Sequence, residues 1–251
     1  MRRLLLGLCL LLACVADASA ANLKLITAAG FRPAARELIA TFEKNTGHKV
    51  TVFTDTTSAL MKRLQSGGET FDVIVLPDAA MDSLAGTNTL IDDSIVPLAK
   101  GGFGIAVSLS APPPAIYSAE VVRRTLLQAH AVAYIDPIMG GPTGAYVVKL
   151  FQMMGIEPEI RRKSVLVRSG LVGERVARGD ADVAIDQVSE LRQVPGIRFA
   201  GNMPANLQSY TTYAGAISAK SKERDAAIAL IAAFTDPAAE DVLKRRGLEL
   251  P

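Results

Sequence analysis

The chain has 251 residues, of which 49% are hydrophobic, and its formal net charge is +2. This much apolar material predicts one large folded domain or two modest ones and excludes a disordered chain. The near-neutral charge predicts no nucleic-acid partner and no attraction to an anionic membrane surface.

The first 20 residues have the pattern of a cleaved secretion signal. Arg2 and Arg3 are followed by an apolar stretch over residues 4–12 and by the small residues Ala18-Ser19-Ala20 before the expected cleavage site. Removing this leader, which holds two arginines and one aspartate, leaves a net charge of +1. We therefore expect a periplasmic protein, exported through a cleaved signal peptide.

Both cysteines, Cys9 and Cys14, lie in this leader, so the mature chain has no disulfide, thiol nucleophile or thiolate metal site. The residues before Cys14 also resemble a lipoprotein cleavage signal, although Leu12 fits that signal poorly. A lipid anchor at Cys14 is therefore an alternative to soluble export, and the pattern favours soluble export.

Strand and helix patterns alternate along the mature chain, which predicts an α/β fold with mainly parallel sheets. In the first part we expect strands at residues 23–27, 49–53, 71–76 and 103–109, a helix with Pro33 in its first turn, a helix with Ser58 as N-cap and a helix at 79–85. A proline-rich break at 111–114 then leads to a second α/β series.

The second series continues to the end of the chain. We expect helices at 118–128, 143–154, 173–177, 223–234 and 237–245, strands at 131–135, 164–167 and 182–185, and an extended segment at 208–218.

The predicted strand-to-helix junctions are rich in Gly, Ala, Ser and Thr. In open α/β sheets, ligands bind beyond the carboxyl ends of the strands, where helix N-termini offer free N–H groups and hydroxyls add donors without charge. Four such junctions are Ala28-Ala29-Gly30-Phe31, Asp55-Thr56-Thr57-Ser58, Gly140-Gly141-Pro142-Thr143-Gly144 and Arg168-Ser169-Gly170. Taken singly, each is explained by helix capping and turns. Together in one cleft they would bind a small oxyanion.

Two arginines, Arg32 and Arg168, adjoin these junctions. Guanidinium groups suit carboxylates, so either one facing the cleft would make a small organic carboxylate the alternative ligand. The competing interpretation is that both point to solvent or pair with surface acids. His48 and His130 lack further ligands at metal-binding spacing, and no nucleophile elbow or phosphate-loop motif is present.

The chain resembles the periplasmic molybdate-binding protein family of ABC importers. The resemblance begins with LKLITAAGFRPAARELIATFEKNTGHKV and TTSALMKRLQSGGETFDVIVLPD, continues in DPIMGGPTGAYVVKLFQMMG and GERVARGDADVAIDQVSEL, and covers essentially all the mature chain in order. It implies a two-lobed type II periplasmic binding protein with a ligand cleft between the lobes. Lobe I would hold residues 21–104 and 214–251, and lobe II residues 105–213.

In the first lobe, the resemblance implies two hydroxyl contacts to the anion. The first serine contact of the family falls on Gly30, where the hydroxyl is missing and the backbone N–H of Gly30 or Phe31 remains as a donor. The second serine contact falls on Thr57 or Ser58, which keep a hydroxyl.

In the second lobe, the resemblance implies contacts from a helix start and two strand ends. The small residue that binds through its backbone N–H matches Thr143, with Gly144 beside it, and a further backbone contact falls near Ser169. The family's tyrosine matches Gln187, whose amide replaces the phenol.

These observations predict a monomeric solute-binding subunit that captures molybdate or tungstate and presents it to an ABC permease. A small organic carboxylate is the alternative ligand, and a ligand-sensing partner of a membrane receptor is the alternative role. No cofactor or metal is expected. An enzyme on the same fold is disfavoured, because we find no paired base, nucleophile or metal set in the sequence.

Overall fold

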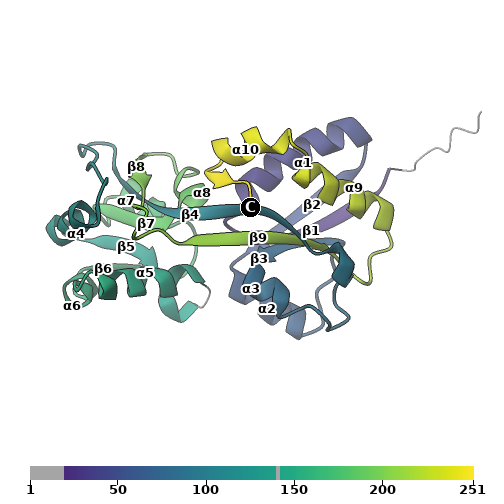
Figure 1. The fold of residues 1–251 in the computed structure, drawn as a ribbon, viewed down its shortest axis with the longest axis horizontal. Helices are drawn as coiled ribbons and strands as arrows, with labels where there is room; N and C mark the ends of the chain where they lie inside the picture. The colour runs from purple at the N-terminus through teal and green to yellow at the C-terminus, as the bar shows by residue number, and fades with distance from the viewer. Residues whose placement is uncertain (1–19, 140–141) are drawn as a thin grey trace, which may run out of the picture.

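The computed structural model describes residues 20–139 and 142–251. Residues 1–19 of the predicted signal peptide, which include both cysteines, lie outside these ranges. Gly140 and Gly141 of the third junction also lie outside them. The described chain forms two α/β lobes joined by long strands, which confirms the predicted fold class (Figure 1).

The first lobe is a mixed sheet with helices on both faces. Strands β1 (Asn22–Ala28), β2 (Lys49–Asp55) and β3 (Val73–Pro77) are parallel, and β9 (Tyr210–Ile217) pairs antiparallel to β3. Helices α1 (Arg32–Thr46), α9 (Arg224–Thr235) and α10 (Ala239–Arg245) cover one face, and α2 (Thr57–Gln65) and α3 (Asp78–Asp82) cover the other (Figure 1).

The second lobe repeats this plan with shorter elements. Strands β5 (Val132–Ile135), β6 (Ser164–Val167) and β7 (Val183–Gln187) are parallel, and the helices are α4 (Ala119–Gln128), α5 (Pro142–Met153), α6 (Glu157–Arg161), α7 (Gly173–Ala177) and α8 (Val188–Leu191). The 3-10 turn η2 (Pro137–Met139) precedes α5. The carboxyl ends of the parallel strands in both lobes are therefore the places where ligand-binding loops are expected.

Strand β4 (Val96–Ser108) belongs to both lobes. Its first half pairs with β9, and its second half, from Phe103, pairs with β7 and with β8 (Ile197–Asn202). Figure 1 shows β4 and β9 side by side between the lobes. The short strand β10 (Leu248–Glu249) also pairs with β4, so the C-terminus returns to this junction.

Separate hydrophobic cores hold the two lobes. One cluster combines β1, β3 and α1 with Tyr213 of β9 and with α9 and α10, and includes Leu25, Ile74 and Leu230, all fully buried. The clusters of the second lobe include Leu150 and Ile185, which are also fully buried. Burial of each such side chain contributes roughly 1.5–3 kcal/mol, so each lobe has its own source of stability.

The structure corrects several predicted element boundaries. Thr56, not Ser58, caps α2, because its side chain accepts a hydrogen bond from the backbone N–H of Ala59 at 3.3 Å. Strand β4 begins at Val96, seven residues before the predicted start at 103, because tertiary pairing with β9 overrides its proline and glycines. Elements β8, β10, α6 and α8 were not predicted. No helix among the described residues is long and apolar enough to span a membrane.

Candidate functional site

A pocket of about 410 Å³ lies where the strand ends of both lobes meet. First-lobe residues line it from β1, β2, β3 and their loops, and second-lobe residues line it from the ends of β5, β6 and β7 and the start of α5. Its lining includes Gly30, Arg32, Thr54, Asp55, Thr56, Thr57, Ile135, Met139, Thr143, Arg168, Ser169, Leu171, Glu174, Gln187, Glu190 and Tyr213. Six hydroxyl side chains and two guanidinium groups in one pocket are suited to an anionic ligand.

In the first lobe, the β2–α2 junction provides the hydroxyls. Thr54, Thr56 and Thr57 line the pocket, and the hydroxyl of Thr56 is already used as the helix cap. Ser58 does not line the pocket, because it lies one residue further into α2. Of the two alternatives Thr57 and Ser58, the structure therefore brings only Thr57 to the pocket.

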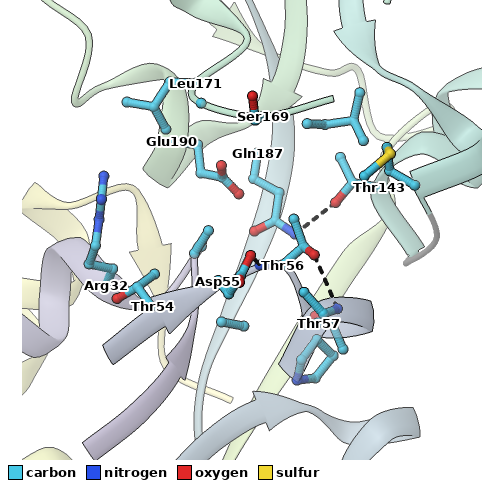
Figure 2. A pocket seen from close by; sticks show the side chains of 18 of the residues that line it. Arg32, Thr54, Asp55, Thr56, Thr57, Thr143, Ser169, Leu171, Gln187 and Glu190 are labelled. Atoms are coloured by element: carbon cyan, nitrogen blue, oxygen red, sulfur yellow. Dashed lines mark hydrogen bonds between the residues drawn. The ribbon is translucent and has the colours of Figure 1, made fainter. Parts of the chain in front are cut away.

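In the second lobe, Thr143 at the start of α5 and Ser169 after β6 line the pocket (Figure 2). They follow β5 and β6, which are neighbouring parallel strands. Gly144 does not line it. A Cβ atom at Gly144 would lie 2.9 Å from the Cα of Pro137, so this glycine allows the start of α5 to pack against the preceding turn. Its role is close backbone packing.

Gly30 is overlaid by two side chains from elements distant in sequence. A Cβ atom at Gly30 would collide with the hydroxyl of Tyr213 and the amide oxygen of Gln187. The Tyr213 hydroxyl donates to that amide oxygen, and the Gln187 amide nitrogen lies 3.5 Å from the hydroxyl of Thr143 and 3.4 Å from that of Thr211. The space where the resemblance would place a serine side chain is therefore filled by Tyr213 and Gln187.

Phe31, which was also predicted to bind through its backbone, belongs to the core. Its side chain is fully buried, with its ring centroid 6.1 Å from that of Tyr213 and 5.6 Å from that of Phe234. Its backbone N–H donates to the carbonyl of Ala28 at 3.2 Å, which closes the turn after β1. The N–H of Phe31 is thus engaged within the turn.

Arg32 directs its guanidinium group toward the pocket. Its Nη2 donates to the side-chain oxygen of Gln193 at 2.8 Å, and its Nε atom is buried without a hydrogen-bond partner in the described chain. A buried charged donor without a partner is costly, since such groups are nearly always satisfied by protein, water or ligand. Within the described chain, the Nε–H of Arg32 is therefore unpaired but enclosed by protein, and the guanidinium group contributes to the pocket lining as a cation.

Arg168 differs from Arg32 because it already has a carboxylate partner. Its Nε donates to Asp136 at 2.9 Å, and Asp136 is fully buried while the arginine side chain remains 71% exposed. The pKa of Asp136 is lowered, first by the hydrogen bond from the backbone N–H of Ile138 and then by Arg168. Asp136 therefore stays ionised and offsets the charge of Arg168.

Glu190 places a carboxyl group in the same pocket (Figure 2). Burial raises the pKa of Glu190 to about 7, although the nearby Arg32 guanidinium acts in the opposite direction. Burial and then Glu190 also raise the pKa of Asp186, whose Oδ2 atom is buried without a partner in the described residues. Because a raised carboxyl pKa means that the folded state retains protons, ionisation of this pair lowers stability as the pH rises toward neutrality.

The residues that sequence reasoning missed are Glu190, Tyr213 and Glu174. Glu190 lies three residues after Gln187, within the short helix α8. Its short distance in sequence from Gln187 could have predicted that it lines the same pocket. Tyr213 lies within a segment that was predicted only as extended. Within residues 20–139 and 142–251, no three His, Cys, Asp or Glu side chains gather as a metal site.

Sequence and structure comparisons place the chain in a family. The model of a bacterial extracellular solute-binding protein family matches residues 23–249. The chain belongs to this family. The match covers both lobes and the pocket between them.

Two relatives and one solved structure show what the chain resembles. An aconitate isomerase of Pseudomonas sp. is 32% identical over 234 residues, covering 91% of this chain and 87% of the relative. A molybdate-binding protein of Azotobacter vinelandii is 27% identical over 246 residues, covering 96% and 94%. The solved periplasmic molybdate-binding protein of Azotobacter vinelandii has a TM-score of 0.75 at 20% identity, covering 91% and 99%. The predicted resemblance to molybdate-binding proteins is confirmed.

Replacing Gly30 with Ser should destabilise the protein by about 1–3 kcal/mol, because the new side chain must displace Tyr213 and Gln187 from a packed site. Chemical denaturation measures this difference. Gly68→Ser is the matched control, since nothing lies within 4 Å of a Cβ atom there. Equal stability of both variants would show that Tyr213 and Gln187 do not fill the position as described.

Replacing Thr57 with Ala should weaken ligand binding about 5- to 10-fold, which corresponds to the loss of one hydrogen bond of about 1 kcal/mol. The neighbouring Ser58→Ala variant should bind as the wild type does, because Ser58 does not line the pocket. Isothermal titration with any ligand that the protein binds makes the comparison. An equal loss of ligand affinity in both variants would contradict the conclusion that Thr57 lines the pocket and Ser58 does not.

Proposed function

We propose that this protein is an exported solute-binding component that captures a small organic polycarboxylate in the pocket between its lobes and presents it to an ABC permease. Membership in the solute-binding family supports the binding role. The polycarboxylate, in place of molybdate or tungstate, is inferred from the residues of the pocket.

The guanidinium group of Arg32 carries this inference. It is partly buried at the start of α1, anchored on Gln193, and its Nε lacks a partner in the described chain. A planar guanidinium with free N–H groups matches the two oxygens of a carboxylate, and this geometry is the reason that arginine is preferred at carboxylate sites. Arg168 lines the same pocket and is a second cation, whose charge is offset by its ion pair with Asp136.

The size and lining of the pocket also support an organic ligand. Its volume of about 410 Å³ falls within the range of sites for small organic molecules. Apolar side chains from Ile135, Met139 and Leu171 line it beside the polar groups. A carbon skeleton would use these surfaces, whereas an inorganic oxyanion has no apolar part to place there.

The serine position of the molybdate-binding pattern also differs in this chain. Gly30 stands there, and the Tyr213 hydroxyl and Gln187 amide occupy the space that a serine side chain would need. The Tyr213 hydroxyl donates its only hydrogen to the side-chain oxygen of Gln187, so it cannot donate the same hydrogen to an anion. These changes disfavour a tetrahedral oxyanion held by a ring of hydroxyls.

The relative that is 32% identical over nearly its whole length supports a specific substrate class. It is named aconitate isomerase, and aconitate is an unsaturated tricarboxylate. A second candidate function, isomerisation of such a tricarboxylate, is favoured by one observation in this structure: Glu190 places a titratable carboxyl group in the pocket.

The strands β4 and β9 suit the protein for ligand-driven closure. Both run between the lobes, so twisting them would change the width of the pocket without breaking either sheet. A ligand that contacts both lobes favours the closed arrangement by the free energy of the contacts that only this arrangement allows. The closed form would then be the form that a permease recognises.

Thermal unfolding with a ligand panel tests the proposal. We expect cis- and trans-aconitate or citrate to raise the melting temperature, since a ligand at 100 times its Kd adds about 2.7 kcal/mol of stability. Molybdate, tungstate and sulfate should give no shift. A shift with molybdate alone would overturn the polycarboxylate assignment and support the oxyanion alternative.

Arg32→Gln should weaken binding of the active carboxylate by about 10- to 100-fold, the loss expected for a charged hydrogen bond. The control is Arg36→Gln, because Arg36 is exposed on the same helix outside the pocket. Titration calorimetry compares the two variants. Equal affinities would mean that Arg32 does not hold the ligand.

A further inference from the structure

The carboxyl group of Glu190 has no role in holding the fold that the structure can account for. Glu190 lies in the short helix α8, which follows β7, and its carboxyl group points into the pocket (Figure 2). No side-chain hydrogen bond or ion pair between described residues includes it, although Arg32 lies close enough to influence its charge. It is thus a polar group directed at the ligand space without a protein partner.

A carboxyl group in this place is unexpected in a site that only binds carboxylates. An ionised Glu190 would repel an anionic ligand, and like charges in a desolvated pocket oppose each other strongly. Burial raises the pKa of Glu190 to about 7, so both protonation states of this carboxyl group are populated near neutrality. A group of this kind is able to accept and return a proton.

The surroundings of Glu190 support such an exchange. Six charged or titratable groups face it or the same pocket: Arg32 from α1, Asp55 from β2, Arg168 after β6, Glu174 from α7, Asp186 from β7 and Tyr213 from β9. The pKa values of Asp186 and Tyr213 are both raised, in each case first by burial. In both groups burial therefore favours the neutral form.

We propose that Glu190 is the acid–base residue of an allylic isomerase activity, transferring a proton between two carbons of an unsaturated polycarboxylate bound in this pocket. The inference rests on the proposed function, because it requires a ligand of that class at Arg32. It gives the second candidate function a chemical step and assigns the residue that performs it.

The step balances without any other reactant. The ionised Glu190 carboxylate removes a proton from the methylene carbon next to the double bond, and the electron pair of that C–H bond forms a new double bond. The electron pair of the old double bond moves to its far carbon, which takes a proton back from the Glu190 carboxyl group. The double bond has then shifted by one carbon, and nothing is oxidised or reduced.

The same pocket provides for the charge that develops in this step. When the proton leaves carbon, negative charge spreads onto the adjacent carboxylate group of the ligand, and a guanidinium at that carboxylate stabilises it. Arg32, which lines the pocket and is anchored on Gln193, provides this cation. The two groups do not pair with each other within the described chain, so a ligand can lie between acid–base and cation.

Exchange with solvent deuterium tests the inference. The wild-type protein is incubated with cis- or trans-aconitate in D₂O, and ¹H NMR follows loss of the methylene and vinyl signals and conversion between the isomers. We expect exchange that exceeds the protein-free rate, and Glu190→Gln should reduce it at least about 100-fold, the lower end of general acid–base contributions. Binding of aconitate by Glu190→Gln, measured by thermal shift, should be kept.

Glu120→Gln is the matched control, since Glu120 is exposed at the start of α4 and lies outside the pocket; its exchange rate should equal that of the wild type. Absence of an aconitate-induced shift in the wild type would refute the proposed function itself. Aconitate binding without exchange, or equal exchange in Glu190→Gln and the wild type, would overturn only the role of Glu190.

A pH profile keeps the test decisive if Glu190→Gln does not fold. Because the base form of Glu190 starts the reaction, the exchange rate of the ligand-saturated wild type should rise with pH and level off above the pKa of Glu190. The Glu190→Asp variant keeps a carboxyl group on a side chain that is shorter by one methylene. It should retain part of the wild-type exchange rate. A rate independent of pH, or full activity with Asp, would contradict the assignment.

Discussion

The hydrogen bond between Tyr213 and Gln187 connects the two lobes at the floor of the pocket. Tyr213 lies in the core of the first lobe, and Gln187 ends strand β7 of the second. The contact is possible only because residue 30 is glycine, since any Cβ atom there would collide with both side chains. The turn after β1, the central strand β9 and the β7–α8 junction therefore depend on one another, and together they set the shape of the ligand space.

The charges around this floor decide which ligand the pocket suits. Arg168 is offset by the buried Asp136, whereas Arg32 retains a donor without a protein partner. Glu190 opposes an anionic ligand when it is ionised and tolerates it when it is protonated. A pocket with a free guanidinium, apolar walls and a titratable acid is better matched to an unsaturated organic acid than to molybdate. This combination links the binding role of the family with the proposed proton transfer.

Much of the fold followed from local patterns in the sequence. The alternation of apolar strands and small-residue junctions predicted the α/β fold, and the family resemblance implied the two lobes. Five of the predicted contact positions, from Gly30 to Gln187, line one pocket, and Arg32 and Arg168 line it as cations. Phe31, Ser58 and Gly144 do not line it, because core packing, helix position and a close backbone contact fix them elsewhere.

The rest could not be predicted because it depends on contacts between distant segments. Tyr213 reaches Gly30 across 183 positions of sequence only through the pairing of β9 with β3. The raised pKa of Glu190 arises from burial, which a sequence pattern in α8 does not reveal. Strand β4 also crosses both lobes through pairing that its proline and glycines do not favour locally.

The most direct test of the central claim is a crystal structure of the protein with trans-aconitate. The account predicts a carboxylate of the ligand within about 2.7–3.2 Å of the Arg32 guanidinium nitrogens, the usual hydrogen-bond range, with the carbon skeleton beside Glu190. A ligand bound elsewhere, or a pocket that excludes aconitate but holds molybdate on the hydroxyls of Thr57 and Thr143, would contradict it.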